Sequence, residues 1–151
     1  MFAWCPWADV LYGQDADFWK AYMPKIKESG FTGLLIAPGS YLPGIRQVKF
    51  PHGANSGLGV LNLALHFGAS RVLLIGYDAQ HTGGQKHCHG DHPKGLGNAG
   101  SVDKWPTQFR SMFRVLPKAE IVNCSRVTRL DCFKRGVLEA ELARNDEVLE
   151  A

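Results

Sequence analysis

A histidine-rich segment, His87-Cys88-His89-Gly90-Asp91-His92, is the densest cluster of side chains that could do chemistry. Its HxHxDH pattern could hold a zinc ion through His87, His89, Asp91 and His92, and such an ion would activate water. Three features oppose a zinc hydrolase. No histidine follows His92 to complete the ligand set, Gly83-Gly84-Gln85-Lys86 precedes the segment in place of an apolar strand, and 151 residues are few for such an enzyme. The alternative is a polar loop whose imidazoles hydrogen-bond a substrate or the backbone, with no metal.

Two further sets of residues could bind a phosphate or a hydroxyl group. Asn55, Ser56 and Gly57 precede an apolar helical segment, and the N–H groups that begin a helix attract phosphate. The alternative there is a plain N-terminal cap. Asp78 ends an apolar run, at the place where open α/β sheets bind ligands. It could hold a ribose hydroxyl or a metal, or it could only cap the next turn.

The spacing of apolar residues predicts the elements that position these side chains. Helices are expected over 15–27, 58–67 and 105–116, the first with a kink or an early stop at Pro24. Residues 8–12 are a short apolar run. The apolar runs at 33–37 and 71–78 indicate buried strands, a last strand is expected at 120–125, and an edge strand is expected at 48–50. Residues 79–103 form a polar loop of about 25 residues, a length that is usually functional or disordered.

A buried helix, a tight turn and a buried strand in succession predict an α/β fold. We expect a Rossmann-like doubly wound, mostly parallel sheet in three α/β/α layers. One domain is expected over 1–136, followed by a charged helix over 137–151. In that helix Leu138, Leu142 and Val148 alone are suited to packing, so it would lie loosely or contact another subunit.

Composition excludes several classes of protein. Hydrophobic residues make up 45% and charged residues 21%, which is typical of globular proteins and not of disordered ones. A net charge of +3 is too small to argue for a nucleic-acid partner. No apolar run reaches the roughly 18–20 residues that cross a bilayer, and the N-terminus does not resemble a signal peptide, so a cytoplasmic protein is expected. The four scattered cysteines are expected as reduced thiols.

The order of these motifs resembles the core of the bacterial α-2,3-sialyltransferase-like family, a grouping that includes relatives of 6-hydroxymethylpterin diphosphokinase. The resemblance covers about residues 8–130. It is carried by Asn55-Ser56-Gly57, the buried helix and Arg71-Val72-Leu73-Leu74-Ile75-Gly76-Tyr77-Asp78. The later Gly83-Gly84, His89-Gly90-Asp91-His92-Pro93 and Asn98 are similar to a version common in phage and prophage proteins of unknown function.

The resemblance implies a Rossmann-like fold that binds a nucleotide, often a cytidine (CMP-type) nucleotide sugar, for glycosyl transfer without a metal. It implies that Asn55, Ser56 and Gly57 contact the nucleotide phosphate or ribose and that Asp78 lies beside the donor. A loop histidine, with His92 as first choice and His89 as second, would deprotonate the acceptor hydroxyl.

The chain departs from the family at its beginning. Family members start with a strand and a Gly-x-Gly-Pro-Ser loop followed by an Asn, and this chain has no such loop, as if about 40 residues, one βα unit, were absent. Three functions remain as alternatives: a nucleotide-sugar-dependent glycosyltransferase or its inactive remnant, a non-catalytic phage protein that sequesters a nucleotide, and a zinc-dependent hydrolase. The sheet edge that a missing strand would expose favours a homo-oligomer.

Overall fold

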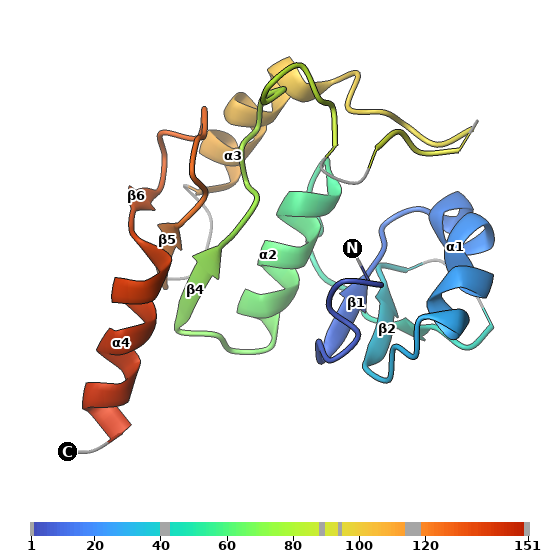
Figure 1. Ribbon diagram of the computed structural model, residues 1–151, viewed down its shortest axis with the longest axis horizontal. Coiled ribbons are helices and arrows are strands. Elements are labelled where there is room, and N and C mark those ends of the chain that lie inside the picture. The colour runs from blue at the N-terminus through green and yellow to red at the C-terminus, as the bar shows by residue number, and fades with distance from the viewer. Residues whose placement is uncertain (1, 40–42, 88–89, 94, 114–118, 150–151) are drawn as a thin grey trace. The chain divides into compact units, whose positions relative to one another are not determined.

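The computed structural model describes residues 2–39, 43–87, 90–93, 95–113 and 119–149, and it is a mixed α/β fold (Figure 1). These residues form two three-stranded parallel sheets and four α-helices. Contacts divide the chain into two compact units, residues 1–63 with 85–100 and residues 64–84 with 101–151. The division falls inside helix α2 (Ser56–His66), which corresponds to the second predicted helix, and inside the long polar loop over 79–103. The sequence predicts a single domain over 1–136.

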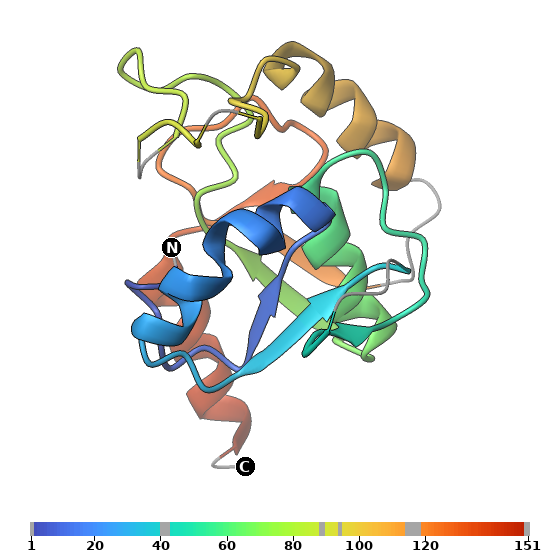
Figure 2. The same cartoon turned by 90° about the vertical axis from the view of Figure 1, so that its right-hand side faces the viewer.

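The first unit contains a parallel sheet in the order β1-β2-β3, formed by β1 (Val10–Tyr12), β2 (Leu34–Ala37) and β3 (Arg46–Gln47). Tyr12 pairs with Ile36 at the carboxyl ends of the first two strands. Helix α1 (Ala16–Glu28) connects β1 to β2 and lies over one face of the sheet (Figure 2). This is a βαβ unit, the arrangement that a helical crossover between parallel strands requires.

Helix α1 forms because its apolar residues recur at helical spacing and pack on the sheet. Trp19 and Ile26 are each only 2% exposed and lie in a core with Ala37 and Ile45. The sequence prediction of an early stop at Pro24 is wrong, because the helix continues to Glu28. Pro24 lies on the exposed face, where water can reach the backbone carbonyl that has lost its N–H partner.

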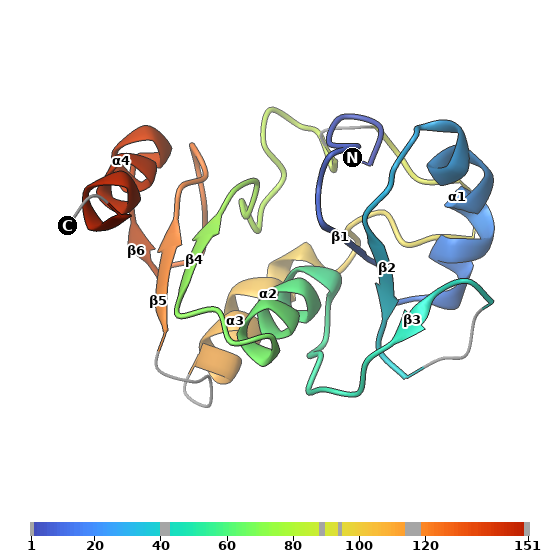
Figure 3. The same cartoon turned by 90° about the horizontal axis from the view of Figure 1, so that it is seen from below.

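The second unit contains a parallel sheet in the order β4-β5-β6. Its strands are β4 (Arg71–Leu74), β5 (Glu120–Asn123) and β6 (Lys134–Arg135), which lie side by side in Figure 3. A short 3-10 turn, η1 (Val102–Lys104), leads into α3 (Trp105–Phe113), which connects β4 to β5. Phe109 of α3 packs edge-on against the rings of Tyr77 and Phe133, and this contact holds the helix in place.

Charged side chains hold helix α4 (Leu138–Leu149) in the second unit, beside a half-buried Leu138. Glu141 is 7% exposed and accepts bonds from Arg71 and from Arg144, whose Nη1 lies 2.6 Å from Oε2. Burial opposes ionisation of Glu141, but these arginines and Lys134 outweigh it and lower the pKa of its carboxyl. Leu142, which the sequence analysis predicts as a packing residue, is 50% exposed. Ion pairs therefore decide which face of α4 points inward.

Two strands differ from their predicted positions. The edge strand expected at 48–50 is β3 at Arg46–Gln47, and Phe50 instead packs its ring against that of Tyr12, with centroids 6.0 Å apart. The strand expected over 71–78 ends at Leu74. Gly76 has a φ of +74°, which turns the chain out of the extended conformation and leaves Ile75 62% exposed. Residues 114–116, expected in the third helix, lie outside the described residues.

Candidate functional site

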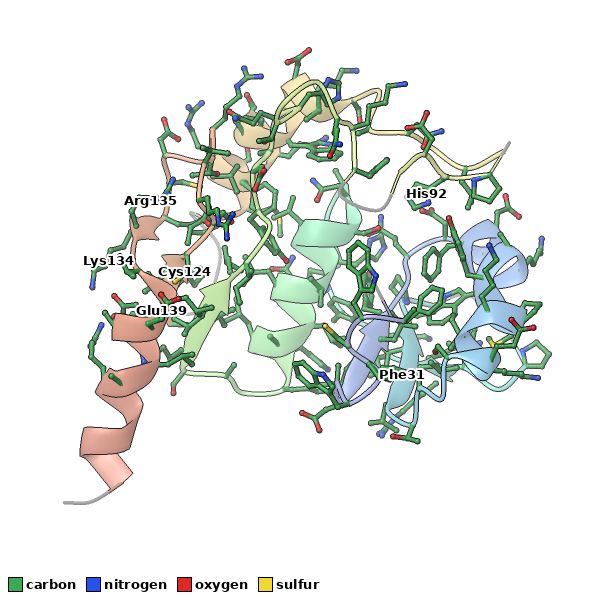
Figure 4. The ribbon with its side chains drawn as sticks, in the orientation of Figure 1. Phe31, His92, Cys124, Lys134, Arg135 and Glu139 are labelled. Atoms are coloured by element: carbon green, nitrogen blue, oxygen red, sulfur yellow. The ribbon has the colours of Figure 1, made fainter. Side chains whose placement is uncertain are left out.

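His92 is the candidate residue whose side chain is most firmly positioned. Its Nδ1 lies 2.7 Å from the hydroxyl of Tyr22, a residue of α1 in the same unit, and the two rings meet edge-on with centroids 5.8 Å apart. Figure 4 labels His92 on its loop near α1. The backbone of His92 is held as well. Its N–H donates to Asn98 Oδ1 at 2.6 Å, and Asn98 Nδ2 donates back to the His92 carbonyl at 3.5 Å. Both ends of the residue are therefore fixed.

Tyr22 is itself held by the aromatic face of α1. Phe18, one helical turn earlier, packs against it with ring centroids 5.1 Å apart, and Phe2 packs edge-on at 5.9 Å. These contacts join Tyr22 to the core formed around Trp19 and Ile26. The Tyr22 hydroxyl therefore contacts the His92 side chain from a rigid helix. A contact of this kind can hold a functional side chain of a loop in one position.

A small polar hollow lies beside His92 in the same loop. It has a volume of about 150 Å³ and is lined by Gln85, Lys86, His87, Gly90 and Asp91. The ring of His87 lies 4.6 Å from that of His92, and the Lys86 ammonium lies 3.9 Å from the Asp91 carboxylate. The hollow therefore carries hydrogen-bond donors and acceptors of both charges.

The HxHxDH segment is described in part. His87, Asp91 and His92 are described, whereas His89, the second candidate for the catalytic base, and Cys88 lie outside the described residues. Within the part of the chain that the structure describes, no three His, Cys, Asp or Glu side chains gather closely enough to hold a metal ion.

The start of α2 is a capped helix N-terminus. The N–H of Leu58 donates to Asn55 Oδ1 at 3.0 Å. Asn55 therefore caps the helix, which is the alternative to a phosphate contact that the sequence left open for it. Ser56 begins the helix and is exposed, and Gly57 follows it in the first turn. One turn further on, a Cβ added to Gly59 would lie 2.5 Å from the Tyr12 hydroxyl, so only glycine lets α2 approach the end of β1 this closely. Burial, with a smaller contribution from Asp15, raises the pKa of Tyr12 to about 12.

Asp78 lies beyond β4 in the second unit, in a turn that a buried polar network holds. Its Oδ2 accepts a bond from the Thr82 hydroxyl at 2.7 Å. Asn123 is 0% exposed and donates to the carbonyl of Tyr77 at 3.3 Å, while Ser125 Oγ accepts the Tyr77 N–H at 2.7 Å. Ala79, which follows Asp78, is held at a φ of +50°, a conformation that costs energy for any residue with a Cβ.

The candidate residues thus belong to both units. His92, Asn55, Ser56 and Gly57 lie in the first, and Asp78 lies in the second. Sequence analysis missed Tyr22 as a functional residue. It lies four residues after Phe18 on an apolar helix stripe, a pattern that indicates core and gives no sign of the hydroxyl's partner. Asn98 was noted in the loop motif, but its contact with the His92 backbone was not foreseen.

Comparison with known proteins adds no relative. The chain matches no family model, no curated protein and no solved structure. Within the described residues, no helix combines the length and the apolar character that a membrane span requires.

Proposed function

We propose that the chain is a Rossmann-like protein with a doubly wound, three-layer α/β/α fold that binds a nucleotide or nucleotide sugar. The observation that carries this proposal is the strand order within each unit. A doubly wound dinucleotide fold has the order 3-2-1-4-5-6, built from two parallel halves. The first unit has three parallel strands in the order 3-2-1 and the second has three in the order 4-5-6. Each unit shares the strand order of such a half and one of its helical crossovers, α1 between β1 and β2 and α3 between β4 and β5, whereas no described helix connects β2 to β3 or β5 to β6.

Each unit by itself offers a group that suits part of a nucleotide. The exposed Ser56 at the start of α2 offers a hydroxyl to a phosphate where the helix dipole also attracts it. Asn55 and Gly57 flank it. Asp78 follows β4, at the carboxyl end of the strand, where a carboxylate can accept bonds from ribose hydroxyls. The resemblance to sialyltransferase-like proteins of phage and prophage type favours a CMP-type ligand.

Glycosyl transfer is the second candidate function, and the fixed position of His92 favours it. Transfer to an acceptor hydroxyl needs a base near neutral pKa, and a positioned imidazole can supply one. As a base, His92 would accept the hydroxyl proton at Nε2, which requires its own proton to be on Nδ1, bonded to the Tyr22 oxygen.

A thermal-shift screen of the full chain tests the binding proposal. The probes are CMP, CDP, UDP and zinc, each with and without EDTA. A nucleotide at about 100 times its Kd adds about 2.7 kcal/mol to the free energy of unfolding, which raises Tm by about 5–10 °C in a protein of this size. We expect such a shift with a cytidine nucleotide, unchanged by EDTA. A shift with zinc alone would overturn the proposal in favour of a metal-dependent hydrolase, and no shift with any nucleotide would also overturn it.

A charge variant tests where the phosphate binds. Ser56→Asp places a carboxylate against the proposed phosphate and should abolish the nucleotide shift. The fold should survive, because an acidic residue in the first turn of a helix is stabilising. Ser111→Asp is the matched control, since Ser111 is an exposed serine of α3 and adds the same charge elsewhere. Unchanged nucleotide affinity in Ser56→Asp would refute the phosphate assignment.

A further inference from the structure

Helix α4 meets the rest of the second unit chiefly through Glu141. Of residues 138–144, whose side chains the structure describes, Glu141 is buried, Leu138 is half-buried and the others are exposed. Most helices in proteins are stabilised by burying an apolar face. The buried residue of α4 carries a carboxylate instead, so the attachment of this helix depends on charge.

Three cations from three elements surround the Glu141 carboxylate. Arg71 of β4 donates to the Glu141 carbonyl at 2.9 Å and, through its other terminal nitrogen, to the carboxylate. Lys134 of β6 lies 3.7 Å from the carboxylate, and Arg144 of α4 itself lies 2.6 Å away. The carboxylate of Glu120 on β5 contacts the same three cations. Glu141 therefore joins α4 to the sheet through a cluster of three cations and two carboxylates.

Gly136 lies between β6 and α4, and its lack of a side chain lets the helix approach the sheet. A Cβ added to Gly136 would lie 2.6 Å from Val122 Cγ1 and 2.8 Å from Glu141 Cγ. Val122 is a fully buried residue of β5. The methylene groups of Glu141 thus lie close to Gly136 and to this apolar residue. Glycine has more backbone freedom than any other residue, so Gly136 is also the place where the chain can bend.

We propose that α4 is a releasable cover of the second unit, with Gly136 as its hinge and the ion pairs of Glu141 as its latch. The helix opens as one element when Glu141 loses its charge, and the β4-β5-β6 sheet stays folded. With both carboxylates ionised, the charges of the cluster nearly balance. With both protonated, three cations face one another without a counter-charge, and their repulsion favours the open helix. The device lies within the second unit and does not depend on nucleotide binding.

Acid is the condition that opens the latch. Burial raises the pKa of the Glu141 carboxyl, but the cations around it outweigh burial and lower that pKa below its ordinary value of 4.5. A carboxyl with a lowered pKa holds the helix closed above pH 4.5, and this contribution is lost as pH falls through the lower value. Burial, with a smaller contribution from Glu141, raises the pKa of the nearby Cys124 thiol, which therefore stays neutral in this range. Arg135 and Glu139, the further charged groups near that thiol, add one charge of each sign.

Backbone amide hydrogen exchange of the full chain, followed by NMR at pH 7, tests the latch. Glu141→Gln keeps the shape of the side chain and removes its charge. The protection of the α4 amides should fall about tenfold to a hundredfold, as loss of a hydrogen bond between charged groups predicts, while the β5 amides keep theirs. Glu139→Gln is the matched control, because it removes the same charge from an exposed position of α4. It should change the protection of α4 by less than about fivefold.

Two further measurements separate the hinge and the acid response. Gly136→Ala keeps every charge but presses a methyl group against Val122 and Glu141, so it should open α4 as Glu141→Gln does. In the wild type, Cα chemical shifts followed from pH 7 to pH 3 should show α4 losing its helical values at a higher pH than β5 loses its strand values.

Several results would overturn the proposal. One is unchanged protection of α4 in Glu141→Gln, and another is a closed α4 in Gly136→Ala. Joint loss of protection in α4 and β5, or joint loss of their native shifts in acid, would make the helix an inseparable part of the sheet's fold. Unprotected α4 amides in the wild type would show that the latch does not close. If Gly136→Ala does not fold, Glu141→Gln and its control decide the question.

Discussion

Replacing Gly59 by alanine tests how closely α2 packs on the end of β1. Gly→Ala inside a helix ordinarily stabilises a protein by about 1 kcal/mol. Here the added methyl carbon would lie 2.5 Å from the Tyr12 hydroxyl oxygen and 2.6 and 2.7 Å from two ring carbons, Cε1 and Cζ. Overpacking of this kind costs about 1–3 kcal/mol, and the Tyr12 ring also packs against Phe50. We therefore expect Gly59→Ala to lower the free energy of unfolding by about 1 kcal/mol.

Urea denaturation of four proteins measures this effect. In the Tyr12→Ala background the ring is gone, so Gly59→Ala should become stabilising by about 1 kcal/mol, the ordinary helix value. Gly100→Ala is the control, because a methyl at Gly100 would meet nothing within 4 Å and should change stability by less than about 0.5 kcal/mol. If Gly59→Ala stabilises the protein with Tyr12 in place, the close approach of α2 and β1 does not exist.

Two further predictions concern buried polar groups. Asn123→Ala should lower the free energy of unfolding by about 1–3 kcal/mol, because the Ser125 N–H, which now donates to Asn123 Oδ1 at 3.0 Å, would be buried without an acceptor. A loss below about 0.5 kcal/mol in urea denaturation would contradict this. Stability should also fall at alkaline pH. Burial raises the pKa of Tyr12 from 10.0 to about 12, so the unfolded chain loses this proton first. The contribution of Tyr12 is complete below pH 10 and is lost as pH rises to about 12, and Tyr12→Phe should show a smaller fall.

Local patterns in the sequence predicted the main elements within a few residues. The apolar run at 33–37 is β2 at Leu34–Ala37, and the run at 120–125 is β5 at Glu120–Asn123. Helices α1 and α2 follow the predicted helical spacing. These predictions succeed because the period of apolar residues reports directly on which face of an element is buried. The two residues of β3 carry no such period, so their position depends on pairing with β2 and could not be read from the sequence.

The candidate residues were predictable in kind but not in their contacts. Asn55 is the helix cap that its residue type and position indicated. His92 was selected as a member of a polar loop, but the sequence gave no reason to pair it with Tyr22, which lies 70 residues away. The inward face of α4 was not predicted either. Leu142 indicated an apolar contact but is exposed, whereas Glu141 on the same helix bonds Arg71, again at a separation of 70 residues.

The sequence by itself determined an α/β chain whose helices and parallel strands alternate, because burial and backbone propensity act over a few neighbouring residues. Only the tertiary structure decided that Tyr22 meets His92 and that Arg71 meets Glu141. Such pairs depend on the path of the chain between them and on the cost of leaving a buried polar group without a partner, and neither is recorded in local spacing. The partner that His92 meets, and with it the surroundings of its imidazole, follows from the tertiary structure.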